Sequence, residues 1–308
     1  MMGVGLQQWS PRQSPAKSKM RSHTLTSAFA WRRLVYFALV LCACGPRIAC
    51  SQTPSPLQEW QYPGGTILEK LYEPNLQEWR VVLGAAVAAQ PRYDGGLAYH
   101  VEPGPVIVIL YKDIAFASVG EGIGVNLIHG DKYRAGISIG YDLGREMSDD
   151  YAHLHGLGNI DPAPVVKLFG SYVISKAFPL VLRADVRRII GGGDGVLGDL
   201  EAFMPLPGSS KTFVMFAGPS VTFSNRQYTQ KVFGVSAAQA ADSAYPVYEA
   251  HGGTTAYGLG FSASRFLTAH WLVNADLAWN HLTGSANDSP ITQSTMQGVI
   301  EFSTEYRW

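Results

Sequence analysis

The sequence predicts an all-β protein, an antiparallel transmembrane β-barrel of about 12 strands that follows an N-terminal signal peptide. Three observations predict this fold: strict two-residue alternation of apolar and polar side chains, connections that alternate between short and long, and a charged fraction of 16%. Soluble domains usually carry ~25% charged residues. A lower fraction is expected of a barrel because half of each strand's side chains face lipid, where charge is costly.

The alternation is clearest in residues 133–145, where one face is apolar and the other is small or polar. The same two faces recur in residues 257–264, 271–280 and 300–308, and aromatic residues often stand at the ends of the apolar face. A soluble sandwich also alternates, but ~10-residue strands with aromatic ends are typical of outer-membrane barrels. Such strands must close on themselves, since an unpaired edge group in lipid costs several kcal/mol.

The connections indicate which end of the barrel faces the periplasm. Those at 113, 130–132, 177–179, 206–211 and 268–269 are short, and most of the others are long. Tight periplasmic turns opposite long outer loops, with both chain ends in the periplasm, are typical of these barrels. Ten strands is the alternative, because the count is least clear over residues 105–129. The twelve expected strands are 79–88, 105–112, 114–120, 123–129, 133–145, 165–176, 180–190, 195–205, 212–224, 254–267, 270–282 and 296–308.

Residues 1–51 are expected to be an export signal that is removed. Arg32 and Arg33 precede an apolar run at 34–44, which has the length of a signal-peptide core rather than of a membrane span. Cleavage fits best after Ser51, and Met20 is an alternative start. A lipid-attachment box that ends at Cys44 is a second interpretation of this segment.

Composition excludes several classes of function. The first 51 residues hold seven of the 24 basic residues and no acidic residue, so residues 52–308 keep 17 basic and 24 acidic residues, a net charge of −7. An acidic chain does not suit nucleic acid as a partner. All three cysteines (Cys42, Cys44 and Cys50) lie in the expected signal, which leaves no thiol for a disulfide, a metal site or a nucleophile.

No residue pattern predicts catalysis, a metal or a cofactor, so the protein is expected not to be an enzyme. His153 and His155 lie two residues apart, but their Gly-rich loop fixes no third metal ligand. His281 with Ser285 and Ser289 invites comparison with an outer-membrane phospholipase, yet these serines lie in a loop without a defined nucleophile and base.

The polar faces of the strands carry charges of both signs, which are expected to point into the lumen. One interpretation makes them the lining of an aqueous channel. The other makes them a structural network across a closed lumen, in which each charge needs a partner. These candidate lumen charges are Arg80, Arg134, Asp142, Lys167, Arg183, Asp185, Arg187, Asp199, Glu201, Asp276, Glu301, Glu305 and Arg307.

Three segments outside the regular strands have separate expectations. Residues 52–78 are expected to form a periplasmic arm before a barrel of residues 79–308, and the aromatic residues of this arm suit partner binding, a lumen plug or a membrane anchor. The connection 225–253 holds an Ala-rich stretch that predicts helical turns, placed either in the barrel mouth or outside it. The chain ends on Tyr306 and Trp308, a candidate signal for the outer-membrane insertion machinery.

Several stretches resemble the MltA-interacting protein (MipA) / OmpV family of Gram-negative outer-membrane proteins. They follow the family's order over nearly the whole mature chain, and the segment 228–253 is the most specific of them. The matching stretches are 83–87 (LGAAV), 91–95 (PRYDG), 122–128 (GIGVNLI), 156–161 (GLGNID), 228–253 and 286–291 (ANDSPI).

The resemblance implies a location more firmly than a molecular role. The family's named member is described as a scaffold that joins a lytic murein transglycosylase to a murein synthase, and other members are described as porin-like. The resemblance therefore implies a scaffold or anchor for periplasmic murein-remodelling enzymes, with a small channel for ions or solutes as the alternative. The partners it implies are outer-membrane lipid and lipopolysaccharide, the barrel-assembly machinery, and a murein hydrolase and synthase.

Overall fold

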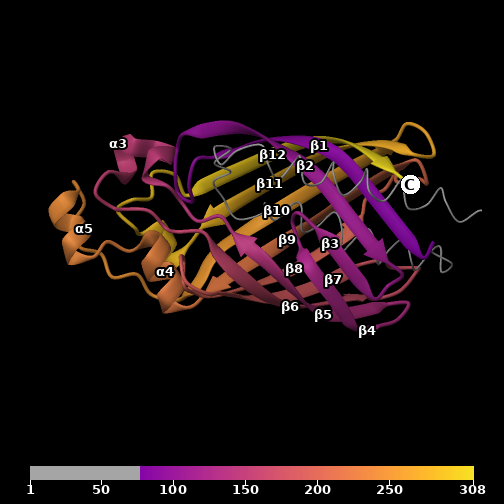
Figure 1. The fold of residues 1–308 in the computed structure, drawn as a ribbon, viewed down its shortest axis with the longest axis horizontal. Helices are drawn as coiled ribbons and strands as arrows, with labels where there is room; N and C mark the ends of the chain where they lie inside the picture. Colours follow the sequence, from indigo (N-terminus) through magenta and orange to yellow (C-terminus); the bar gives the residue numbers. More distant parts are fainter. Residues whose placement is uncertain (1–76) are drawn as a thin grey trace, which may run out of the picture. The chain divides into compact units, whose positions relative to one another are not determined.

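The computed structural model describes residues 77–308, so the expected signal (1–51) and nearly all of the expected arm (52–78) lie outside the described residues. Twelve strands form one closed antiparallel barrel, in which each strand pairs with its sequence neighbours and β12 pairs with β1 (Figure 1). The prediction of 12 strands is confirmed, and the alternative of ten is wrong. The strands are β1 (Trp79–Pro91), β2 (Tyr99–Tyr111), β3 (Ala115–Ser118), β4 (Gly122–His129), β5 (Tyr133–Asp142), β6 (Ala163–Val173), β7 (Val181–Ile189), β8 (Gly195–Pro205), β9 (Phe213–Ser224), β10 (Gly253–Phe266), β11 (Trp271–Leu282) and β12 (Met296–Arg307).

The two faces of each strand differ as the alternation predicts. In β12, Ile300 and Phe302 are 44% and 57% exposed on the outer face, whereas Glu301 between them is 3% exposed. The outer face therefore meets lipid hydrocarbon, and the charged face points into the lumen.

The barrel closes where its first and last strands meet. The β1–β12 pairing runs from Val82↔Arg307 to Ala89↔Ile300, and Trp308 N donates to Val81 O at 3.0 Å. Gly84 lies in this seam against the backbone of Thr304, where a Cβ atom would clash. A glycine is needed there because the two strands approach closely.

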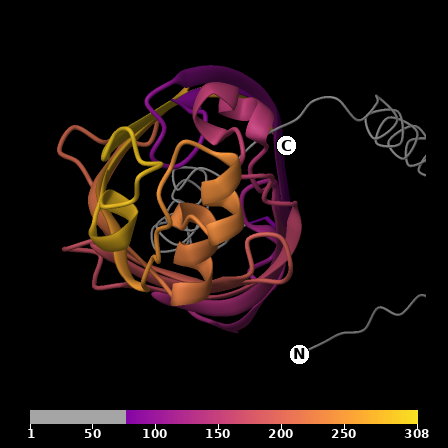
Figure 2. The same ribbon diagram turned by 90° about the vertical axis from the view of Figure 1, so that its left-hand side faces the viewer.

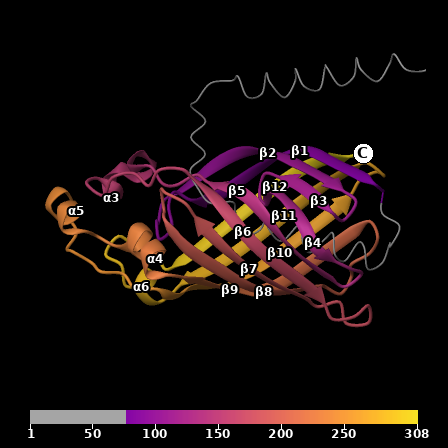
Figure 3. The same cartoon turned by 60° about the horizontal axis from the view of Figure 1, so that its bottom comes forward.

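The two ends of the barrel differ in structure. One end carries short turns and the chain terminus, and the other carries η1 (Met147–Asp150), α3 (Tyr151–Leu154), α4 (Arg226–Phe233), α5 (Ala237–Asp242) and α6 (Gly284–Asn287) (Figures 1 and 3). We call these five helices, with their connecting segments, the outer cap. The short turns mark the periplasmic end.

Aromatic residues stand near both ends of the lipid-facing surface. Trp79 and Tyr111 lie 4.6 Å apart between ring centroids at the periplasmic end, and Tyr257 and Trp279 lie 6.2 Å apart toward the capped end. This is the arrangement of interfacial girdles. No helix among residues 77–308 is long and apolar enough to cross a membrane.

The first hairpin differs from the prediction. Residues 89–104 are predicted as a loop, but β1 extends to Pro91 and β2 begins at Tyr99, with every residue of the two strands paired. Conversely, β3 has only four residues and pairs with β2 only from Val108 to Tyr111. The prolines of β2 suggest a loop because proline has no N–H to donate to a neighbouring strand. Pairing with β1 is still possible, because the backbone positions of these prolines point away from β1.

Candidate functional site: the lumen and its outer cap

A dense set of ionic side chains lies on the inner face of β6, β7 and β8. The register places Glu201 opposite Arg183, Asp199 opposite Asp185, and Lys167 opposite Arg187. Side chains directly opposite one another in a sheet interact strongly, so the register determines which charges meet.

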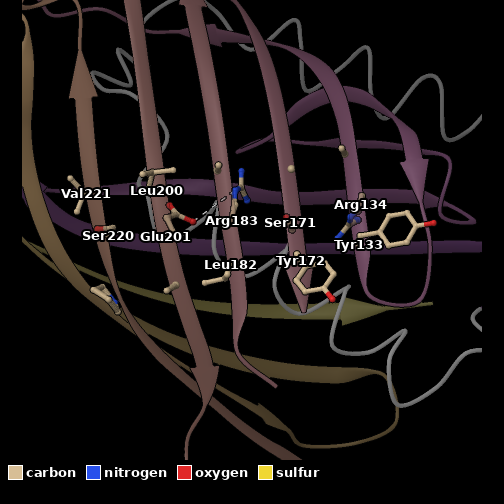
Figure 4. A pocket seen from close by; sticks show the side chains of 15 residues that line it. Tyr133, Arg134, Ser171, Tyr172, Leu182, Arg183, Leu200, Glu201, Ser220 and Val221 are labelled. Carbon is tan, nitrogen blue, oxygen red and sulfur yellow. Dashed lines mark ion pairs between the residues drawn. The ribbon is translucent and has the colours of Figure 1, made fainter. Parts of the chain in front are cut away.

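Arg183 is the centre of this set. Its Nη2 donates to Glu121 Oε1 at 2.8 Å, and its Nε lies 3.8 Å from Glu201 Oε2 and 3.9 Å from Asp185 Oδ2. Lys167 Nζ lies 3.4 Å from the other oxygen of Glu121. The Arg183 side chain is 1% exposed. Figure 4 shows it beside Glu201. The pair of Glu121 and Arg183 thus links the β3–β4 turn to strand β7, which lies beyond β6 in the barrel.

Two carboxylates that face each other in this set are held together by one cation. Asp185 and Asp199 are directly opposite, which is destabilising for like charges. Arg187 relieves the repulsion, because its Nε lies 3.3 Å from Asp185 Oδ1 and its Nη2 donates to Asp199. Thr222 also donates to Asp199, at 2.6 Å.

The wall formed by β11 and β12 is acidic. Asp276 lies opposite Glu301, and both are buried. Glu305 accepts from Asn274 Nδ2 at 2.5 Å and from the Ser303 hydroxyl at 2.8 Å. At the periplasmic rim, the Arg307 guanidinium lies 5.2 Å from the centroid of the Phe266 ring.

The remaining candidate lumen charges lie near the ends of two strands: Arg80 near the start of β1, Arg134 near the start of β5, and Asp142 at the end of β5. Arg80 is 7% exposed, and Arg134 Nη1 lies 4.0 Å from Asp113 Oδ1. Asp142 accepts from Gly144 N at 2.7 Å in the turn that ends β5. Eleven of the thirteen candidate lumen charges are thus buried, all but Arg187 and Arg307, and many of the thirteen form ion pairs or hydrogen bonds.

This arrangement favours a structural network over a channel lining. A buried charge costs several kcal/mol unless a partner and further hydrogen bonds compensate for lost hydration. The pairs described here supply such partners across four segments of the wall. These ion pairs hold the strands in register and place fixed charges of both signs in the lumen.

Helix α4 lies across the outer mouth of the barrel (Figure 2). Asn225 caps this helix by accepting from Tyr228 N at 3.0 Å. The buried face of α4 includes Val232 and Phe233, which pack against the strand ends in a cluster with Ile189 and Leu197. Figure 2 shows α4 lying across the mouth of the barrel. The Ala-rich stretch, for which a place in the mouth and a place outside it were both open, forms α5, which buries no residue. The helix that lies at the mouth is α4 instead.

Arg145 fastens α4 to the barrel. Its Nη1 donates to Val232 O at 3.1 Å, and its own backbone pairs with Ile160. Burial lowers the pKa of the Arg145 guanidinium, and burial also raises the pKa of the nearby Tyr228 phenol well above its usual range. Both shifts reflect a water-poor environment beneath the cap.

Glu121 is the site residue that the alternation did not identify. It lies between Gly120 and Gly122 in the β3–β4 turn, where the two-residue period carries no information about direction. The available signal was an acidic residue between two glycines in a tight turn, because the glycines let the backbone bend and aim the carboxylate inward.

The residues weighed for metal binding and hydrolysis have structural partners. His153 Nδ1 lies 2.9 Å from Asp150 Oδ2, and residues 77–308 hold no group of three side chains suited to a metal ion. Ser289 donates to Phe233 O at 2.5 Å, and Ser285 Oγ accepts from His251 N at 2.9 Å. Both serines therefore serve the outer cap.

A hollow of about 640 Å³ lies on the outer surface over β5 to β9 (Figure 4). Its exposed side chains, such as Tyr172, Leu182 and Leu200, belong to the lipid-facing positions of their strands. Arg183 and Glu201, which follow Leu182 and Leu200 in their strands, direct their side chains to the inner face. This hollow is a depression in the lipid-facing wall, apart from the lumen chemistry.

Comparisons with known proteins identify a family. The family model described as MltA-interacting protein MipA matches residues 83–308. A search of the curated proteins found no match.

Similar solved structures include OmpT, an outer membrane protein of Vibrio cholerae (8% identity, 76% of this chain and 99% of that chain, TM-score 0.33). OprD from Pseudomonas aeruginosa is 12% identical over 73% of this chain and 65% of that chain, with a TM-score of 0.29. A variant of OccD1 (OprD) is 9% identical with a TM-score of 0.34, and the similarity covers 67% of this chain and 55% of the variant's length. Because these TM-scores are below 0.5, the likeness carries no argument about function.

Proposed function

Because this outer-membrane β-barrel belongs to the MltA-interacting protein MipA family, we propose that it is a non-enzymatic scaffold or anchor for periplasmic murein-remodelling enzymes. The partners proposed are a lytic transglycosylase and a murein synthase. The observation that carries the proposal is the structure of the lumen. Many of its charges are buried in ion pairs and α4 lies across its outer mouth, which suits an anchor better than a conduit.

The proposal places function at the periplasmic end of the barrel. Exposed apolar side chains stand in the turns there: Phe178 is 49% exposed in the β6–β7 turn, and Leu267 is 61% exposed in the β10–β11 turn. Exposed aromatic and aliphatic groups at an aqueous rim are typical anchors for protein partners. Residues 52–78, proposed as a periplasmic arm, would add a second contact.

Crosslinking in intact envelopes tests the scaffold. We expect the full-length protein to capture a lytic transglycosylase and a murein synthase above the level captured by an unrelated outer-membrane barrel. Deletion of residues 52–78 or the change Phe178→Ala should reduce the capture, while the barrel still shows its heat-dependent mobility shift. Equal capture by the unrelated barrel would contradict the proposal.

A further inference from the structure

The barrel wall is incomplete on its outer half between β2 and β5. β2 pairs with β1 along its whole length, but its pairing with β3 stops at Val108. β5 pairs with β6 along its whole length, but its pairing with β4 stops at Ile139. Within the described chain, residues 99–106 of β2 and 140–142 of β5 therefore have no paired strand on the sides that face β3 and β4, because β3 and β4 are too short. We call the interval between these two edges the gap.

The free edge of β2 is adapted to lipid by its prolines. Ile107 O accepts from Val119 N at 3.3 Å, so the odd-numbered residues of β2 direct their backbone groups toward the gap. Pro103 and Pro105 are two of these residues, and neither has an N–H that would need a partner. An unpaired N–H in hydrocarbon costs several kcal/mol, so prolines suit an edge that stays open. They also prevent pairing with an added strand.

The gap is bordered at both of its ends. Its lower border is the β3–β4 turn, and its upper border is the contact from Arg92 Nη1 to Asp149 O at 2.8 Å. Val101, Ile123 and Ile139 around it are 68%, 72% and 61% exposed on the lipid-facing surface.

The inner side of the gap is bordered by glycines with free space around them. A Cβ atom on Gly104 would meet no atom of the described residues within 4 Å, and one on Gly140 would meet only Gly122 Cα at 3.9 Å. Behind Gly140 lies a cavity of about 30 Å³, and its lining includes Glu121, Lys167 and Arg187 of the lumen.

Ser138 offers a polar group to a ligand in this cavity. Its side chain points inward from β5, is 2% exposed, and has no hydrogen-bond partner for Oγ among residues 77–308. A buried hydroxyl without a partner costs free energy that a bound polar group would recover.

We propose that this gap is a lateral opening that admits a membrane amphiphile. The hydrocarbon chain of the amphiphile lies in the gap between β2 and β5, and its polar head reaches Ser138 and the charged groups of the cavity. The bordering prolines, the free space at Gly104 and Gly140, and the unpartnered Ser138 hydroxyl all favour this occupant. The opening does not depend on the proposed scaffold role.

The test uses a hexadecyl maleimide, a probe with a membrane-soluble chain and a thiol-reactive polar head. Ser138→Cys is introduced into the full-length chain with Cys42, Cys44 and Cys50 changed to serine, and labelling is measured in lipid vesicles. Ser262→Cys is the matched control, because Ser262 is also inward-facing, 3% exposed and without a partner for Oγ among the described residues. Its strand stays paired on both sides beyond this position, whereas the pairing of β5 with β4 ends one residue after Ser138.

We expect Ser138→Cys to react several-fold faster than Ser262→Cys. Combining it with Gly104→Leu and Gly140→Leu should remove the difference by filling the opening. Gly170→Leu should not, because Gly170 has similar space but lies in a continuous part of the wall. If Ser138→Cys does not fold, as judged by its mobility shift, Gly140→Cys at the same border replaces it. Equal rates at the two cysteines, or labelling of Ser138→Cys by a water-soluble maleimide alone, would overturn the proposal.

Discussion

At the residue scale, the charged residues of the barrel differ in how much their ion pairs contribute to stability. Arg183 contacts carboxylates from three segments, Glu121, Asp185 and Glu201, and its side chain is almost fully buried. Arg188, five residues along the same strand, pairs with Asp194 at 2.8 Å, but its side chain is 45% exposed. Burial rather than pairing sets the energetic difference, because only the buried partners lose their hydration when the pair is broken.

We therefore predict that Arg183→Leu lowers the free energy of unfolding by about 3 kcal/mol, the cost of leaving buried carboxylates without their cation. The matched change Arg188→Leu should cost less than about 1 kcal/mol, as exposed pairs usually do. Urea unfolding in lipid vesicles, followed by tryptophan fluorescence, measures both values. Equal effects would mean that water reaches Arg183 freely and that the lumen is open.

At the element scale, the two helices of the 225–253 connection have separate roles. α4 buries Val232 and Phe233 in the mouth, whereas α5 is a solvated extension of the cap. The Ala-rich composition of 235–241 predicts helical turns there, and α5 forms them. Alternation and propensity did not predict α4, because its helical period covers only eight residues and its partners are strand ends distant in sequence.

We predict that Val232→Asp with Phe233→Ser releases α4 and opens the mouth, since a buried carboxylate without a partner is unfavourable against an apolar cluster. In planar bilayers the wild-type protein should show no steady ion conductance, and the double variant should show stepwise conductance. Ala238→Asp, on the exposed surface of α5, is the control and should stay silent. Steady conductance by the wild type at the variant's level would favour the channel alternative.

The strand lengths show what period and composition can predict at this scale. Strands β4 to β12 lie close to their predicted positions because each has a lipid face that must be apolar. The prediction was wrong at residues 89–104, because the Pro103-Gly104-Pro105 run breaks the period. A strand paired on one side only has no simple sequence signature, since its prolines also fit a loop.

At the scale of the whole molecule, the fold follows from one constraint: every backbone group in lipid needs a partner. That constraint makes closure predictable from alternation alone. It does not give the ion pairs of the lumen, because those depend on register, and a one-residue shift would exchange the two faces of a strand. Lumen-facing positions such as Asp276 and Glu301 were therefore predictable as a class, whereas Glu121 and its contact with Arg183 were not.

The seam between β1 and β12 yields the prediction that tests closure. The last residues do more than add aromatic surface: Tyr306 pairs with Leu83, Arg307 pairs with Val82, and Trp308 N bonds Val81 O. Removal of residues 306–308 leaves the periplasmic end of β1 without a partner on its β12 side, and it also removes the candidate insertion signal. We expect the truncated chain to lose its heat-dependent mobility shift and to leave the outer-membrane fraction.

Trp271→Ala separates closure from the aromatic girdle. Trp271 lies 5.2 Å from Tyr306 between ring centroids and is 46% exposed, close to the 54% of Trp308, but it lies in β11, outside the seam. If the terminal residues act only through their aromatic surface, this change should impair assembly as much as the truncation does. We expect it to leave most of the protein folded in the membrane, because the backbone hydrogen bonds that close the barrel are intact.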